Sequence, residues 1–430
     1  MPELAKHVFD TGFSVQFEGM SDNNCTAFIE RMEFRGDGAY RLVPSYIIKA
    51  MNENPFSFFE MKGDAIDDFF RPARYFYCKA KAGNRDFGNL IYGNEIADSW
   101  SITFEDQQVR ITLSYGDILR HGTASDLMLH PQLKVEFPET TNLPFIYRLH
   151  TVMIRFLQFV RYEVNCGNIR TKLYGNPSSE LFNAGRIIDK HSRQPRFNAY
   201  VGEADYTAYR QYMGNILQFA ANNPRLYMLH FPKEAQRYFS WDYSPLLFTS
   251  LFGAFESECH ADKKTYESVD DSGIVALRTQ MLKQLKQVQI NKDNPEEKQF
   301  LDNACGRLSQ LGTQFGQKKK IAHAFEVLSP ALNSSIENIF IFPEMRYKAP
   351  LTPEQIDMIA SAIAALRGTV VHGDFSGEFT DVQGKLLLFF EILIYAQMLK
   401  RACVDYEGIE MIVGAVFHCN HVLFNKIIRG

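Results

Sequence analysis

The chain has 430 residues, enough for two or three domains, and its 46% hydrophobic and 22% charged residues are ordinary for a globular protein and argue against extensive disorder. Neither half is basic, because residues 1–240 hold 27 Lys+Arg against 27 Asp+Glu, and residues 241–430 hold 19 against 23, which gives the net charge of −4. This balance disfavours a protein that coats or packages nucleic acid, and any RNA site must be a local patch.

The cysteines and the apolar runs indicate a cytoplasmic protein with no membrane partner. Seven cysteines are scattered without a C-x-x-C pair, which fits reduced thiols better than disulfides or a zinc site. The N-terminus has no apolar signal region. The longest apolar run, residues 386–399, contains Glu391 and is too short to span a bilayer.

The first 140 residues are predicted to form mainly strands and turns. Apolar residues alternate with polar ones around Val15 and again on both sides of the polar segment EDQQ at 105–108. A period of two with a short polar connection predicts a hairpin whose turn is EDQQ. The alternating apolar positions of that hairpin are Trp100, Ile102, Phe104, Val109, Ile111 and Leu113.

The next hundred residues are predicted to mix helix and strand. Residues 144–164 form a long unbroken apolar run, which indicates a helix rather than a strand. Residues 165–202 are punctuated by Gly, Asn and Pro, and we expect strands there. Residues 204–238 are expected to be helical and to form a hinge to the C-terminal part.

From Ser244 onward the sequence predicts a bundle of four or more helices. Ser244-Pro245, Asn294-Pro295 and Thr352-Pro353-Glu354-Gln355 are helix start signals, the last of them a capping box. A final helix is expected from about Asp381 to Arg401. The apolar positions expected to face inward are Phe248, Leu251, Phe252, Phe255, Ile274, Leu277, Met281, Leu285, Val288, Phe300, Leu301, Ala304, Leu308, Leu311, Ile356, Ile359, Ile363, Leu366 and Val370.

The expected fold class is therefore α+β, with a β-rich region at residues 1–240 followed by an all-α helical bundle at residues 241–430. We find no internal repeat and no low-complexity segment, and the sequence contains no Walker-type or dinucleotide-binding fingerprint and no G-x-S-x-G elbow.

The stretch LRGTVVHG, residues 366–373, places Arg367 and His372 five residues apart near the end of a predicted helix. Arg can hold a phosphate through two hydrogen bonds and keeps its charge, whereas His can exchange a proton near pH 7. Together they suit phosphodiester chemistry. The alternative is a surface Arg and a helix-terminal His with no joint function.

This motif resembles that of HEPN domains, whose nucleases carry Arg, four to six residues, and then His in an all-helical fold. Within that family the chain is most similar to the ApeA-type proteins of bacterial anti-phage defence, which join a β-rich N-terminal region to a C-terminal HEPN domain. The resemblance covers residues 241–430 by motif and helix order, and residues 1–240 only by architecture. The sequence departs from the family at Gly368, where active members often have a polar residue.

The resemblance implies a metal-independent endoribonuclease that needs no cofactor, cleaves RNA by attack of the 2′-hydroxyl, and acts as a defence or abortive-infection effector. Its partners would be an RNA substrate, a second copy of the chain bound through the C-terminal helices, and a phage-derived trigger or inhibitor. The rival is a non-catalytic HEPN scaffold for dimerisation or for nucleotide or protein binding. A third hypothesis makes residues 1–240 a ligand-binding β-sandwich.

Several further residues are candidates for supporting roles. Lys318, Lys319 and Lys320 could contact RNA phosphates, although a solvated lysine run is the alternative. Glu256 resembles the acidic residue that some HEPN domains place near the Arg-His pair, and Asp374 could orient His372; a rim residue and a turn residue are the respective alternatives. The cluster at 418–421, His-Cys-Asn-His, is a weak zinc signal, and no metal site is expected.

The spacing also makes a geometric prediction. Five residues on a regular helix separate Arg367 and His372 by about 140°. One copy of the motif therefore makes a poor phosphate site unless the helix loosens at Gly368 or ends near His372. A two-fold dimer can supply both residues to one cleft, and the apolar segment 386–399 could be buried in its interface or could be a core helix.

Overall fold

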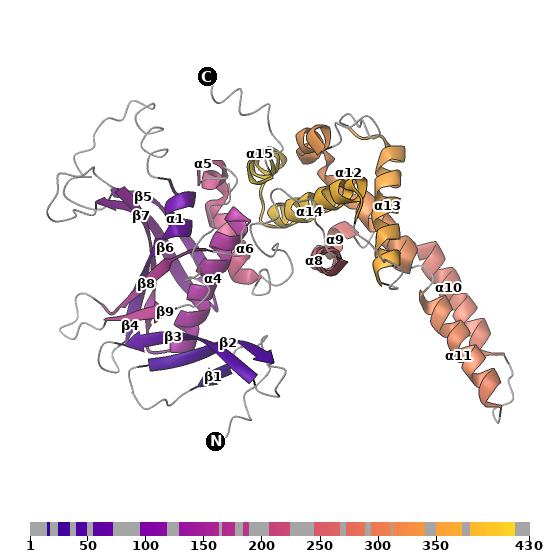
Figure 1. Cartoon of the computed structure of the whole chain (residues 1–430), viewed down its shortest axis with the longest axis horizontal. Helices are drawn as coiled ribbons and strands as arrows, with labels where there is room; N and C mark the ends of the chain where they lie inside the picture. Colours follow the sequence, from indigo (N-terminus) through magenta and orange to yellow (C-terminus); the bar gives the residue numbers. More distant parts are fainter. Residues whose placement is uncertain are drawn as a thin grey trace. The chain divides into compact units, whose positions relative to one another are not determined.

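The computed structural model describes residues 15–17, 25–34, 40–49, 55–71, 95–117, 129–162, 166–176, 184–188, 206–223, 245–266, 272–288, 294–310, 313–339, 350–371 and 379–417. The chain divides into two compact units, Met1–Tyr238 and Phe239–Gly430. The first contains an antiparallel sheet and the second is helical (Figure 1). The mixed α+β architecture expected from the sequence is confirmed, and the division falls two residues before the boundary expected at 240/241.

Unit 1 is built on one antiparallel sheet, in which the described residues form nine strands. The strands are β1 Val15–Phe17, β2 Cys25–Phe34, β3 Tyr40–Lys49, β4 Phe56–Gly63, β5 Glu95–Phe104, β6 Gln107–Asp117, β7 Leu129–Thr140, β8 Ile169–Tyr174 and β9 Ala184–Ile188. Their order is β1-β2-β3-β9-β8-β4-β7-β6-β5. The middle of the sheet therefore joins β4 to β7 and β8, which are far apart in the sequence, and the expected strands in 165–202 are found as β8 and β9.

Alternation of side chains gives the sheet one apolar face. Phe59 lies opposite Leu173 on β8 and Val135 on β7, and all three side chains are fully buried. Because successive residues of a strand point to opposite faces, their neighbours Phe58, Glu60 and Lys172 lie on the other face.

Helices cover the apolar face of the sheet (Figure 1). They are α1 Asp64–Phe69, α4 Leu143–Arg161, α5 Tyr206–Tyr209, η2 Arg210–Tyr212 and α6 Met213–Asn222. Phe145 of α4 packs between Phe104 and Phe137 of the sheet, with ring centroids 5.6 and 6.0 Å away. One sheet with helices on it is not a β-sandwich, so the sandwich hypothesis is wrong for the described part of unit 1.

The β5–β6 hairpin is confirmed, but its turn is shorter than predicted. β5 ends at Phe104 and β6 begins at Gln107, so the turn is Glu105-Asp106 and the two glutamines belong to a strand. Both turn residues have positive φ, 47° and 60°, which is the conformation of a type I′ hairpin turn. That turn twists with the strands, so two residues suffice where the polarity of EDQQ indicated four.

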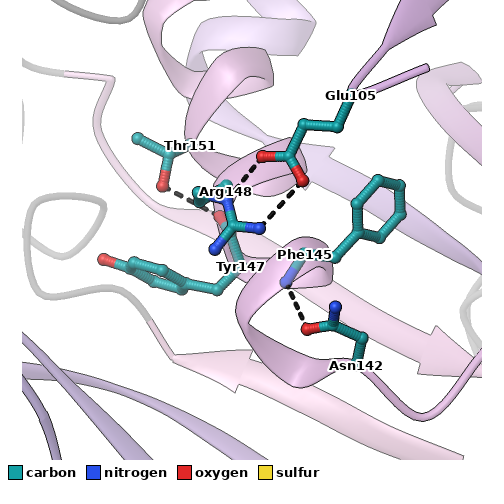
Figure 2. Close-up of polar contacts among 6 residues, drawn as sticks. All are labelled: Glu105, Asn142, Phe145, Tyr147, Arg148 and Thr151. Atoms are coloured by element: carbon teal, nitrogen blue, oxygen red, sulfur yellow. Dashed lines mark hydrogen bonds and ion pairs between the residues drawn. The ribbon is translucent and has the colours of Figure 1, made fainter. Parts of the chain in front are cut away.

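The start of α4 is tied to this hairpin turn (Figure 2). The Arg148 guanidinium donates from Nε and Nη2 to the two carboxylate oxygens of Glu105, at 2.6 and 2.8 Å. The Asn142 side chain accepts a hydrogen bond from the amide of Phe145 at 3.1 Å and so caps the helix. A cap of this kind is worth about 1 kcal/mol, and it fixes the start of the helix that the apolar run at 144–164 predicted.

Residues 206–223 do not form a hinge. Gln218 of α6 accepts a hydrogen bond from the Thr103 amide at 2.8 Å and donates one to its carbonyl at 2.9 Å. Tyr209 donates to the carbonyl of Val160 at 2.7 Å. Because β5 is an edge strand, Gln218 satisfies backbone groups that would otherwise be open. This segment is part of unit 1, and the hinge interpretation is wrong for it.

Unit 2 is helical, and its helices α8, α12, α13 and α15 pack around one buried helix, α14. The helices are α8 Pro245–Ala261, α9 Lys263–Tyr266, α10 Ser272–Lys286, α11 Pro295–Gln310, α12 Thr313–Ile339, α13 Pro353–Val371, α14 Asp381–Arg401 and α15 Tyr406–Val416. The helices starting at Pro245, Pro295 and Pro353 begin at the predicted signals, and α14 has the predicted bounds. α12 and α15 were not predicted.

α14 is a core helix and not an interface. Phe389 stacks on Phe325 of α12 with ring centroids 4.8 Å apart, and Phe390 packs on Phe252 and Phe255 of α8. Its segment Val382–Arg401 is long and apolar enough to cross a membrane, but 78% of the apolar window is buried within the protein. The suggestion that this helix offers apolar surface to a second subunit is therefore wrong, because its own unit covers it.

Several apolar residues expected to face inward from α10 and α11 are exposed, contrary to prediction. Leu277 and Met281 of α10 are 56% and 43% exposed, and Phe300 of α11 is 76% exposed. Val288, 53% exposed, lies beyond the end of α10 at Lys286. The two helices lie side by side (Figure 1), joined by a hydrogen bond from Arg278 to the carbonyl of Ser309. Periodicity correctly grouped these residues on a helix face, but it cannot say whether another element covers that face.

Gly63 joins β4 to α1 and offers a direct stability test. It has φ of 139°, and a Cβ there would meet the carbonyl oxygen of Asn168 at 1.8 Å. We predict that Gly63→Ala destabilises unit 1 by more than about 2 kcal/mol. The added Cβ would strain the backbone at Gly63 and push away the Asn168 carbonyl, which directly precedes β8. Denaturant unfolding measures this change.

Gly214→Ala is the matched control, because its Cβ would meet only Trp100, at an ordinary 3.8 Å, and the residue is helical. It should be neutral or stabilising by up to about 1 kcal/mol. Equal stability of the two variants would contradict the close approach at Gly63.

Candidate functional site

The predicted capping box positions the helix that carries the Arg-His motif. The Thr352 hydroxyl accepts a hydrogen bond from the Gln355 amide, and the Gln355 side chain accepts one from the Thr352 amide, at 3.3 and 2.9 Å. α13 then continues to Val371 without a break at Gly368. A loosened helix at Gly368 is therefore excluded as the means by which Arg367 approaches His372.

His372 and Asp374 lie outside the described residues, so only the Arg half of the motif has a structural description. A Cβ built on Gly368 meets no atom within 4 Å. A larger side chain at this position would thus find room beside Arg367.

Arg367 is anchored by residues of α8. Its Nη2 donates to Oε1 of Glu256 at 3.2 Å, and its guanidinium carbon lies 5.0 Å from the centre of the Phe252 ring. Both contacts lie one helical turn apart on α8. The Arg367 side chain remains 34% exposed and that of Glu256 41% exposed, so solvent reaches the pair.

Glu256 is held in turn by α12. Gln317 Nε2 donates to the same Glu256 oxygen at 2.6 Å, while the Oε1 of Gln317 is buried with no hydrogen-bond donor among the described residues. Three helices thus meet at Glu256. The structure places this expected supporting residue against Arg367. Sequence reasoning missed Gln317, because α12 was not predicted and nothing local marks that residue.

This arrangement suits recognition of a phosphate. One guanidinium nitrogen is engaged with Glu256 and one face of the group is covered by Phe252, which leaves further N–H donors on its exposed side. An anchored guanidinium loses less conformational freedom on binding than a free one, and it can present two parallel donors. The Glu256 carboxylate acts against phosphate binding, because it partly neutralises the positive charge of Arg367.

The three lysines expected to bind RNA do not form one patch with Arg367. Lys318 pairs with Asp357 of α13 at 2.7 Å, ten residues before Arg367 on that helix. Consecutive helical residues point about 100° apart, so Lys318, Lys319 and Lys320 cannot share a face. The charge of Lys318 serves to join α12 to α13.

Cys259 on α8, near Arg367, is not placed to act as a nucleophile. Burial raises the pKa of Cys259 to about 12, so this thiol is protonated at neutral pH. The cavity lined by Glu258, Tyr266, Gln397 and Arg401 has a volume of about 10 Å³, room for about one water molecule. It cannot hold a nucleotide.

No three His, Cys, Asp or Glu side chains gather into a possible metal site within the described ranges. The cysteines described there with their side chains, at 166, 259, 305 and 403, are free thiols. The cluster at 418–421 lies outside the described residues.

Comparisons with protein-family models, with curated proteins and with solved structures find no match.

The capping box predicts a measurable effect on unit 2. Thr352→Ala should lower its unfolding free energy by about 1 kcal/mol, because the Gln355 amide loses its acceptor at the start of α13. Ser361→Ala is the control on the same helix, since the Ser361 hydroxyl only donates to the Asp357 carbonyl. Its effect should stay within about 0.5 kcal/mol. Thermal melts that rank the two variants the other way would contradict the cap.

Proposed function

We propose that unit 2 is a HEPN-type endoribonuclease domain, in which Arg367 binds the scissile phosphate and His372 transfers protons. The observation that carries the proposal is the anchoring of Arg367. Its guanidinium is held by Glu256 and Phe252 yet stays partly exposed, five residues before His372. An anchored, solvent-accessible guanidinium beside a group that titrates near neutrality is suited to phosphodiester cleavage.

The reaction uses the nucleophile that RNA supplies. The 2′-hydroxyl oxygen attacks the adjacent phosphorus, the O2′–P bond forms and the P–O5′ bond breaks. His372 accepts the 2′-hydroxyl proton or donates a proton to the leaving 5′-oxygen. Arg367 stabilises the charge that develops on the phosphoryl oxygens. The products are a 2′,3′-cyclic phosphate and a 5′-hydroxyl, and no metal or cofactor takes part.

Two copies of the chain would share the site. α13 is continuous through Gly368 and ends at Val371, directly before His372, so the helix fixes Arg367 but not the residue beyond its end, and a second copy can supply the His372 of the same cleft. The outward face of α13 carries Met358, 60% exposed, with the small residues Ala365 and Gly368 at helical spacing. Small residues let two helices approach closely, so this face can bring the two RGTVVH segments together in a C2 dimer.

The rival function is a non-catalytic scaffold, and one observation favours it. Glu256 already satisfies part of the Arg367 charge, as expected for a residue that only joins α13 to α8. In this case Arg367 and His372 would matter for packing and not for RNA.

The biological role follows from the resemblance alone. We propose a cytoplasmic anti-phage effector that cleaves RNA when a phage-derived trigger relieves its restraint. Expression of the wild type beside His372→Ala, followed by sequencing of RNA ends, tests for cleavage in cells and identifies the cleaved sites.

Arg367→Ala and His372→Ala are each predicted to abolish RNA cleavage by the purified protein while changing the melting temperature little. Arg367 forms a half-exposed ion pair, and such pairs contribute about 0–1 kcal/mol to stability. A gel assay with labelled RNA and a thermal melt decide the matter. Cleavage that survives in both variants would reject the site, and unfolding of both would favour the scaffold.

RNA with a 2′-deoxy or 2′-O-methyl group at the scissile position is predicted to resist the enzyme, because the nucleophile is gone. Unmodified RNA should be cut in excess EDTA and give ends with a 2′,3′-cyclic phosphate or its 3′-phosphate hydrolysis product. Mass spectrometry of the products identifies these ends. Efficient cleavage of the modified strand, or a strict need for Mg²⁺, would contradict the mechanism.

Ala365→Arg is predicted to convert a dimer into monomers and to remove cleavage, because a long charged side chain would stand in the α13 contact. Light scattering across a dilution series measures the assembly. Gln284→Arg, which adds the same charge at an exposed position of α10, is the control and should leave both properties intact. A fully active monomer at every concentration would refute the composite site.

A further inference from the structure

The sheet of unit 1 has a second face that α1, α4 and α6 do not cover. On the central strands this face carries Phe58, Glu60 and Lys62 of β4, which lie opposite Tyr174, Lys172 and Arg170 of β8. Toward β6, Thr112, Ser114 and Gln132 are buried, so the exposed part of the face is centred on β4, β8 and β9. We call this part the open sheet face.

The open sheet face is basic, although unit 1 as a whole is neutral. Arg186 of β9 lies opposite Lys172, and Lys134 of β7 lies opposite Glu60. With Lys62 and Arg170, these residues give five basic side chains against two acids, Glu60 and Glu136, among the described residues of this face. Glu139 lies at the edge, where it accepts a hydrogen bond from Asn176.

Three of the bases are available to a ligand. Arg170, Lys172 and Arg186 are exposed, and none of them forms an ion pair with another described residue. Lys134 differs, because it pairs with Glu136 at 2.7 Å. Exposed cations on neighbouring strands that pair with no described carboxylate are the electrostatic footprint of a polyanion.

Two aromatic rings lie among these basic side chains. Phe58 and Tyr174 stack across β4 and β8, with ring centroids 4.9 Å apart and planes 18° from parallel. The Lys134 ammonium lies 4.4 Å from the centre of the Phe58 ring. Both rings are partly exposed, so a ligand on this face of the sheet can contact them.

We propose that the open sheet face binds single-stranded RNA. Bases stack on exposed aromatic rings, and cations spread along neighbouring strands contact the phosphates. A base that displaces the Lys134 ammonium from Phe58 extends the existing stack by one ring, and the released ammonium can then meet a phosphate. The inference deepens the proposed function, because it assigns RNA selection to unit 1, but the binding itself does not depend on cleavage.

An anionic membrane or an acidic peptide would also be attracted by the charge. Neither makes use of a stacked aromatic pair flanked by cations in the way that unpaired bases do. Double-stranded RNA hides its base faces, so it would engage the cations alone. These three ligands are therefore the discriminating controls.

The test measures binding of a fluorescent single-stranded RNA of about ten nucleotides, within the span that single-strand sites cover, to the full chain carrying Arg367→Ala. The triple variant R170A/K172A/R186A should weaken binding at least tenfold and lower the slope of log K against log salt by about two, since each phosphate contact contributes about 0.7. The control K283A/K286A/K298A removes the same charge from α10 and α11 and should bind normally.

Phe58→Ala should weaken binding about tenfold and Phe58→Tyr should not, because stacking needs a ring. Thermal melts show whether each variant is folded, and the triple variant changes only exposed side chains. Unchanged affinity in the triple variant, an equal loss in the control, or equal binding of duplex RNA, polyglutamate or phosphatidylserine vesicles would overturn the proposal. Absence of cleavage by the wild type would refute the proposed function and leave this result standing.

Discussion

The position of Arg367 depends on the packing of α8 and α13 against the same buried helix, α14. Phe252 and Phe255 of α8 pack on Phe390 of α14, while Ile359 and Ile363 of α13 are fully buried in the same core. With both helices fixed, Glu256 and Arg367 can meet only at the rim where the apolar contacts stop. The ion pair there is weak in itself, and its geometry comes from the aromatic core beneath it.

In unit 2 the starts of helices could be predicted from the sequence, whereas the elements that cover each helix could not. The capping box at Thr352 and the first-turn prolines marked helix starts because caps and N1 prolines act locally. α12 was missed, since its polar start and the internal Pro330 obscure the apolar period. Phe300 was assigned to the core because periodicity defines a face of a helix, whereas coverage of that face depends on elements far away in the sequence.

In unit 1 the alternation of residues predicted strands but not the sheet. The β5–β6 hairpin was accessible because its two strands are adjacent in sequence, and only its turn was misjudged. The pairing of Phe58 with Tyr174 joins residues more than a hundred positions apart, and no local signal encodes it. The basic charge of the open sheet face therefore depends on which residues the strand register brings together. It could not be predicted from residues 1–240, whose overall charge is neutral.

The candidate site could be predicted only in part from the sequence. Arg367 and Glu256 were found through a motif resemblance, and the structure places them in contact. Gln317, which holds Glu256 from α12, could not be anticipated because its role exists only once three helices have packed. Glu256 gains a function beyond charge compensation in this arrangement, since it orients the guanidinium while Phe252 supports one of its faces.

In the proposed nuclease, Glu256 would act on RNA cleavage through Arg367, because it holds the guanidinium, and a double-mutant cycle tests this coupling most directly. Single-turnover RNA cleavage would be measured for the wild type, Glu256→Gln, Arg367→Lys and the double variant. The account predicts that Glu256→Gln slows cleavage about tenfold beside Arg367 and has little effect beside the lysine, a coupling of about 1.4 kcal/mol, within the range for residues in contact. Independent, additive losses, or full activity of Glu256→Gln, would contradict it.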